Sequence, residues 1–179
     1  MIYLFALQSN NKTNESKGTV PFDSFWDDEM TKEKAQELIQ IMKRLLKTGV
    51  YELPKVGTMD KLPLQSQQSS KVKFDVYINR KGRIDPKKYT LLLHFSEEDL
   101  LRIDVHGTDH HNPDGTVVPC PHIHMRMKDT GRWDSYAYDI PAVFGDTEDC
   151  ALTVRDFLHY CNTNNINEIT ICEQKGLFI

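Results

Sequence analysis

The sequence predicts an α+β domain with one mostly antiparallel sheet of about five or six strands, an N-terminal helix and a C-terminal helix. Two separate segments, 31–48 and 147–161, repeat apolar residues every three or four positions, as amphipathic helices do. Between them, segments of alternating apolar and polar residues follow one another over 72–140, separated by turn residues. Strands grouped between two helices are typical of α+β folds.

Length and charge limit the classes of protein that fit this chain. The chain has 179 residues, the usual size of one domain. We assign 1–29 to a polar, irregular N-terminal segment and 30–179 to the single domain. With 22 basic and 26 acidic residues, the net charge of -4 argues against a protein that coats nucleic acid through bulk electrostatics.

Cysteine usage and hydropathy predict a cytoplasmic protein that does not enter a membrane. The four cysteines form no CxxC pair, which favours reduced thiols over a disulfide framework. The apolar start at 2–7 is too short for a signal peptide or a membrane span. The sequence leaves the oligomeric state open.

The elements follow in order from local signals. Thr31 is placed to cap the helix over 31–48. Residues 53–70 hold two prolines and little periodicity, so we expect a linker leading into the sheet. The β-rich body over 72–140 begins as a meander. A second helix over 147–161 and a last strand over 168–173 close the domain.

Histidines are concentrated in one short part of the body. Five of the seven lie close together: His106, His110, His111, His122 and His124. The unperturbed pKa of histidine lies near neutrality and its imidazole is a common metal ligand, so the cluster indicates proton transfer or metal binding. The alternative is a polar loop in which the histidines only make hydrogen bonds.

Two strands of the body carry these groups on matching faces. In the first strand, apolar Leu101, Ile103 and Val105 alternate with Arg102, Asp104 and His106. In the second, Ile123, Met125 and Met127 alternate with His122, His124, Arg126 and Lys128. An antiparallel pairing through the long loop between them would place the two polar sets side by side on one sheet face.

This inventory predicts an RNA-cleaving endoribonuclease. His122 and His124 are the candidates for acid and base, Asp104 for orienting one of them, and His106 as a further catalytic candidate. The phosphate contacts would come from Arg102, Arg126 and Lys128. Attack by a ribose 2′-hydroxyl needs a base, an acid and positive charge, so no cofactor is assumed.

A metal-dependent hydrolase is an alternative that uses the same atoms, with a divalent metal as cofactor. The candidate ligands are His106, His110, His122 and His124, which suit a tetrahedral zinc site or an octahedral site. Between them, the segment from Asn112 to Gly115 predicts a tight turn rather than a calcium loop.

A third hypothesis is a non-catalytic protein that blocks a nucleic-acid-binding partner with an acidic surface. Its basis is acidic mimicry of nucleic acid. The contacts would come from Asp23 to Glu29, with Phe25 and Trp26 between them, and from Glu97 to Asp99.

Four segments of the chain resemble an uncharacterised bacterial and phage family, a domain of unknown function. They are YINRKGRI at 77–84, LRIDVH at 101–106, HNPDG at 111–115 and PHIH at 121–124. The similarity runs from about Thr31 to the C-terminus and implies no established activity. Phage-borne proteins of this size include anti-CRISPR inhibitors, some of which cut guide RNA, so a guide RNA or its protein complex is one expected partner.

A weaker similarity links the chain to the small TumE-type toxins of toxin–antitoxin pairs. These toxins also show a meander, an Arg-x-Asp strand, a loop, a His-x-His strand and a closing helix. The matching residues here are Arg102, Asp104, His122 and His124. The insertion at 107–121 and the N-terminal helix depart from the toxin pattern.

Overall fold

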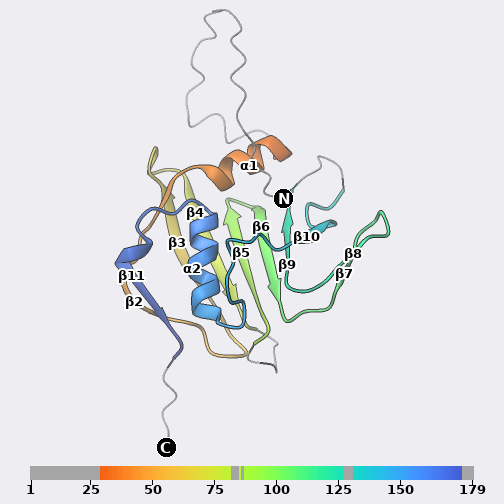
Figure 1. Ribbon diagram of the computed structural model, residues 1–179. Helices are drawn as coiled ribbons and strands as arrows, with labels where there is room; N and C mark the ends of the chain where they lie inside the picture. Colours follow the sequence, from red (N-terminus) through yellow and green to blue (C-terminus); the bar gives the residue numbers. More distant parts are fainter. Residues whose placement is uncertain (1–28, 82–84, 86, 127–130, 175–179) are drawn as a thin grey trace, which may run out of the picture.

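The computed structural model describes residues 29–81, 85, 87–126 and 131–174 (Figure 1). Two α-helices are present in these ranges, α1 (Lys32–Gln40) and α2 (Cys150–Tyr160), with a short 3-10 helix at Ile166–Glu168. No helix in the described part is long and apolar enough to cross a membrane. The polar segment at 1–28 and Lys128 lie outside the described residues.

The main sheet has seven strands in the order β1-β3-β4-β5-β6-β9-β10, with every neighbouring pair antiparallel. Their bounds are β1 Lys43–Leu45, β3 Met59–Ser66, β4 Lys73–Asn79, β5 Tyr89–Phe95, β6 Glu98–Val105, β9 His122–Met125 and β10 Ala137–Asp139. The α+β class and the antiparallel meander are therefore confirmed, and the sheet is larger than the five or six strands predicted.

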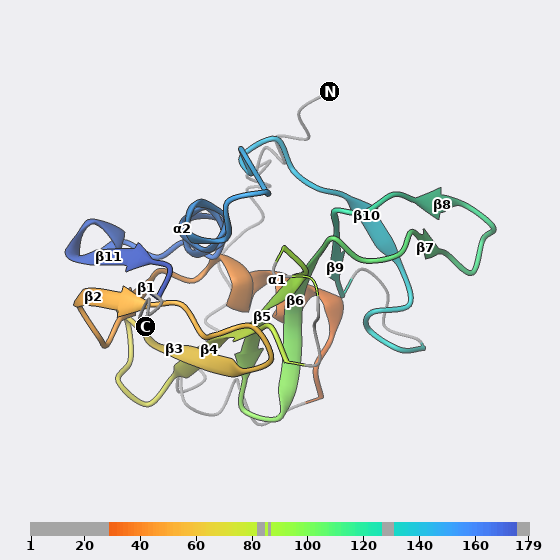
Figure 2. The ribbon, with the colours of Figure 1, turned by 90° about the horizontal axis from the view of Figure 1, so that it is seen from below.

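Two small sheets flank the large one. In the first, β2 (Gly49–Glu52) pairs in parallel with β11 (Ile169–Cys172). The last strand predicted from the sequence is thus present but does not join the main sheet. In the second, β7 (His110–His111) and β8 (Val117–Val118) form a hairpin arm that extends away from the helices, beside β9 and β10 (Figure 2).

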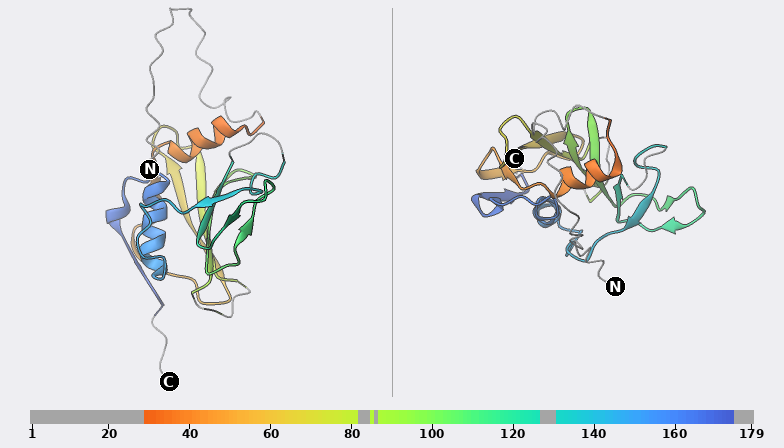
Figure 3. Two further views of the ribbon diagram at one scale, coloured as in Figure 1. Left: turned by 45° about the vertical axis from the view of Figure 1, so that its right-hand side comes forward. Right: turned by 90° about the horizontal axis from the view of Figure 1, so that it is seen from above.

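Both helices pack against the apolar face of the sheet. In Figure 3, α2 runs alongside the strands and α1 crosses near their ends. The core includes Leu38 from α1, Ile103 and Ile123 from the sheet, and Val154 and Phe157 from α2, all with almost no exposed surface. Covering one face with helices leaves the opposite face of β6 and β9 for polar side chains.

The helix predicted over 31–48 is wrong in its second half. The α1 helix ends at Gln40, and Lys43–Leu45 forms β1. Lys43 turns its ammonium into the core, and the backbone N–H of Leu45 donates to the Asn165 side chain at 2.7 Å. These contacts with distant residues outweigh the helical spacing of the apolar residues.

The linker predicted over 53–70 is also wrong, because it contains strand β3. Leu62, Leu64 and Ser66 alternate toward the core and are fully buried. Pro63 has no N–H to donate to a neighbouring strand. Its carbonyl accepts from the Leu46 N–H, so the missing N–H lies on the same side, just past the end of the β1 pairing, and the strand tolerates it. The predicted helix over 147–161 is present as α2, capped by the Asp149 side chain.

Candidate functional site

The pairing of β6 with β9 brings the predicted polar residues together. Asp104 lies opposite His122 and Arg102 lies opposite His124, as an antiparallel pairing through the long loop requires. Directly opposed residues project from the same face of a sheet. The cluster therefore lies on the face opposite the helices, at the end of the sheet that carries the β7–β8 arm.

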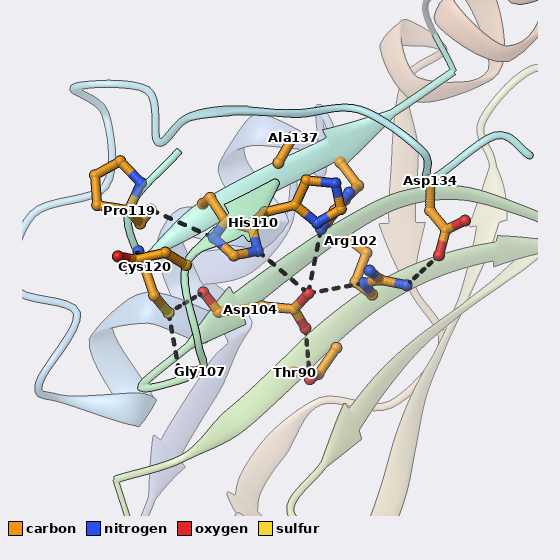
Figure 4. A network of polar contacts seen from close by, with 12 residues as sticks. Thr90, Arg102, Asp104, Gly107, His110, Pro119, Cys120, Asp134 and Ala137 are labelled. Atoms are coloured by element: carbon orange, nitrogen blue, oxygen red, sulfur yellow. Dashed lines mark hydrogen bonds and ion pairs between the residues drawn. The ribbon is translucent and has the colours of Figure 1, made fainter. Parts of the chain in front are cut away.

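The Asp104 carboxylate is the centre of this cluster (Figure 4). Its Oδ1 accepts from the Thr90 hydroxyl at 2.8 Å, and its Oδ2 accepts from Arg102 Nε at 3.0 Å. The same Oδ2 lies 3.4 Å from His124 Nε2 and 3.7 Å from His122 Nε2. Burial opposes ionisation of Asp104, but His124, Arg102 and Thr90 together hold its pKa well below the usual range. Asp104 is a carboxylate at neutral pH.

The Arg102 guanidinium is shared between two carboxylates. Besides Asp104, it donates from Nη1 to Asp134 Oδ2 at 2.8 Å, and Asp134 also accepts from Arg132. Burial would raise the pKa of Asp134, but the two arginines lower it. Most of the positive charge of Arg102 is therefore balanced within the protein, and Arg132, whose side chain is 82% exposed, is the more accessible cation.

A third imidazole, that of His110, joins His122 and His124. Its ring centroid lies 5.7 Å from that of His122 and 4.8 Å from that of His124, and the latter two are 5.0 Å apart. The His122 side chain is 4% exposed and that of His124 is completely buried. Burial, followed by the neighbouring His124, lowers the pKa of His122, which favours its neutral form.

Each of the three imidazoles donates one ring N–H to a backbone carbonyl. His122 Nδ1 lies 3.3 Å from the Pro119 oxygen, His124 Nδ1 lies 3.1 Å from the Tyr136 oxygen, and His110 Nε2 lies 3.1 Å from the Ser135 oxygen. A carbonyl oxygen only accepts, so the ring nitrogen must carry the proton. In the neutral rings, the lone pairs are then on Nε2 of His122, Nε2 of His124 and Nδ1 of His110.

The β7–β8 arm is anchored so that it presents His110 to the cluster. The buried Asn112 side chain accepts from the Ala137 N–H at 2.8 Å and donates to the Ala137 carbonyl at 3.1 Å and to the Thr116 hydroxyl at 3.0 Å. The predicted turn is confirmed, with Gly115 at a φ of +87° that glycine adopts readily. Asn112 thus fixes the arm onto β10.

Other residues predicted for the site lie elsewhere. The chain turns at His106, whose φ is +53°, and its Nε2 lies 2.6 Å from Glu148 rather than on the face of Asp104. Arg126 pairs with Glu98 at 3.1 Å. Lys128 is outside the described residues. Sequence analysis missed Thr90 and Asp134, which come from another strand and from a loop and belong to no motif, and it identified Asn112 only as part of a turn.

An open cavity borders the cluster at Asp104. This side chain is 23% exposed and, with Thr90 and Gly107, lines an open cavity of about 190 Å³. Near the cavity, the Cys120 thiol accepts from the Gly107 N–H at 2.9 Å, and burial raises its pKa. Cys120 is therefore a thiol at neutral pH and a poor nucleophile.

The acidic surface considered above is only partly described. Residues 23–28 lie outside the described residues. In the second acidic stretch, Glu98 pairs with Arg126, and Asp99 lies 2.8 Å from His94 Nδ1. These contacts reduce the charge that this stretch offers to a partner.

Comparison with known proteins places the chain in a family without assigning an activity. The model of a family of unknown function, DUF6978, matches residues 30–163, and the chain belongs to this family. This confirms the resemblance to an uncharacterised domain family. Searches of the curated proteins and of the solved structures gave no match.

Proposed function

We propose that the protein is an endoribonuclease whose reaction centre is the Asp104 side of the histidine cluster. The observation that supports this most directly is the β6–β9 register, which places Arg102, Asp104, His122 and His124 on one sheet face beside an open cavity. Cleavage by a ribose 2′-hydroxyl requires proton transfer and charge stabilisation, and these side chain types supply both.

Burial separates the roles of the two histidines. His124 has no exposed surface, so it cannot touch a scissile phosphate and acts through its neighbours. His122 is 4% exposed, and its Nε2 lies 3.7 Å from Oδ2 of Asp104, which borders the open cavity. His122 is therefore the group proposed for proton transfer, and the accessible Arg132 is proposed to contact phosphate together with Arg102.

Metal-dependent hydrolysis is a second candidate function, and one observation favours it. One ring nitrogen from each of His110, His122 and His124 lies within 4.8 Å of the other two, close enough for the three rings to serve as ligands to one metal ion. In both cases the proposed setting is the cytoplasm of a bacterial host, with the protein encoded by a phage or mobile element. Its role would be that of a toxin or of an anti-CRISPR protein that cuts guide RNA.

The test is cleavage of a panel of structured RNAs, single-stranded RNAs and guide RNAs, with and without EDTA. We expect defined cuts by the wild type and a loss of at least about 100-fold in rate for His122→Ala and Asp104→Asn. The matched control is His159→Ala, an exposed histidine on α2 that should keep full activity. Cuts that persist in EDTA would assign the reaction to proton transfer, and cuts that disappear would assign it to a metal.

The proposal fails if the folded protein cuts no RNA, or if His122→Ala cuts at the wild-type rate. Circular dichroism and thermal unfolding of each variant would show that a loss of cleavage is not a loss of fold.

A further inference from the structure

We propose that His110, His122 and His124 form a binding site for a divalent transition metal ion, with zinc as the best fit. Asp104 is the anionic neighbour of this site. This inference concerns what the cluster binds, and it stands whether or not the protein cleaves RNA.

The first argument is the direction of the ring protons. A histidine that ligates a metal through one ring nitrogen almost always donates the other N–H to a carbonyl or a carboxylate, which fixes the tautomer. All three rings meet this condition, with partners on three separate backbone positions: Pro119, Tyr136 and Ser135. Each ring is thereby left with one nitrogen whose lone pair is available to a metal ion.

The second argument is the unpartnered nitrogen of His124. This Nε2 atom is buried and makes no hydrogen bond with any described residue. Its nearest anionic neighbour is Asp104 Oδ2 at 3.4 Å, which is too far for a good hydrogen bond. In the neutral ring, a nitrogen lone pair and a carboxylate oxygen then face each other, which is unfavourable. A cation at this position, either a proton on His124 or a metal ion, would be stabilised by both groups.

The third argument is the size and chemistry of the site. One ring nitrogen from each of the three histidines lies within 4.8 Å of those of the other two. A tetrahedral zinc ion bound at its usual Zn–N distance requires nitrogens about 3.3 Å apart, so binding would draw the rings together. The His110 side chain has the most room to move, because it is only partly buried whereas His122 and His124 are buried. Imidazole donors favour zinc and its neighbours over magnesium or calcium.

Metal binding would change the roles that His122 and Asp104 can have in catalysis. The ion would take the lone pair of His122, which would then be a ligand instead of a proton carrier. Asp104 would either complete the tetrahedron or leave the fourth position open toward its cavity. This consequence, unlike the binding site itself, rests on the proposed function.

The experiment is a titration of the full chain, stripped with chelator, with Zn²⁺ by calorimetry and with Co²⁺ by absorption spectroscopy. We expect one ion per chain and the intense visible bands of tetrahedral Co²⁺. His110→Gln and His124→Gln should each weaken binding at least about 100-fold. The matched control is His111→Gln, the exposed neighbour of His110, which should bind as the wild type does.

The titrations test metal binding independently of RNA cleavage. Absence of binding, or equal binding by His110→Gln, His124→Gln and the wild type, would overturn it. If His124→Gln fails to fold, His110→Gln decides, because its site lies on the arm and outside the core. Metal binding without RNA cleavage would leave the inference standing and overturn the ribonuclease, whereas cleavage by a protein that binds no metal would do the reverse.

Discussion

Lys43 and His124 are both buried without exposed side-chain surface, yet their polar atoms are satisfied to different degrees. Lys43 Nζ donates to the carbonyl oxygens of Ile39, Ile41 and Cys161 at 2.8, 2.9 and 3.0 Å. His124 donates one N–H to Tyr136, and its other nitrogen makes no hydrogen bond with a described residue. Because a buried polar atom without a partner costs about 1–3 kcal/mol, the two sites have different explanations.

The Lys43 site is complete without a ligand. An ammonium has three N–H donors, and the three carbonyls accept all of them. Burial lowers the pKa of Lys43 to about 8, so the side chain remains mainly charged at neutral pH. Its contacts join the C-terminal ends of α1 and α2. Lys43 is structural, whereas the ring nitrogen of His124 that makes no hydrogen bond with a described residue is one of the atoms proposed above to bind a metal ion.

The largest effect is expected when the complete site is broken. Lys43→Met keeps most of the side chain volume but leaves three buried carbonyls without a donor, so we expect a loss of about 3–5 kcal/mol in the free energy of unfolding. Urea unfolding measures it. The exposed Lys47→Met should change stability by less than about 0.5 kcal/mol. A loss from Lys43→Met as small as that of the control would show that the carbonyls do not depend on Lys43.

A smaller effect should follow when the arm is released from the incomplete site. Asn112→Ala removes the hydrogen bonds to Ala137 and Thr116, and we expect a loss of about 1–3 kcal/mol in the free energy of unfolding. It should also weaken zinc binding at least about tenfold, because His110 loses its fixed position. Calorimetry on Asn112→Ala and on the exposed Asn164→Ala checks this. Unchanged zinc affinity in Asn112→Ala would show that the arm does not position a ligand.

These two sites also mark what the sequence could and could not predict. The pairing of Asp104 with His122 was predictable because residues on one face alternate with a period of two and the long loop favours an antiparallel return. The β1 strand was not predictable, since Lys43 and Leu45 continue a helical spacing and their strand form depends on Cys161 and Asn165. Contacts with residues that are distant in the sequence therefore determine the secondary structure of this segment.

The candidate site also contains residues that the sequence predicts and residues that it does not. Its central residues come from the alternation on β6 and β9, whereas Asp134 and Thr90 are brought in by a loop and by a neighbouring strand. His106 was misplaced because a strand pattern does not show where the strand ends, and the chain turns at this residue with a positive φ. A sequence pattern gives the face of a side chain but not its partners.

The smallest effect concerns the Cys161 thiol, which is buried near Lys43. Burial raises its pKa to about 12, although the charge of Lys43 opposes this, while the unfolded chain ionises near 9.0. Above pH 9 the unfolded state therefore loses its proton first, and the free energy of unfolding falls with rising pH, by at most about 1.4 kcal/mol per unit.

The variant Cys161→Ala lacks this contribution. Subtracting its free energy of unfolding from that of the wild type at each pH removes the pH dependence that other titrating groups give to both proteins. We expect the wild type to be more stable below pH 9 and its advantage to shrink between pH 9 and 10.5, as measured by urea unfolding. Parallel curves for the two proteins would mean that the thiol does not titrate differently on folding.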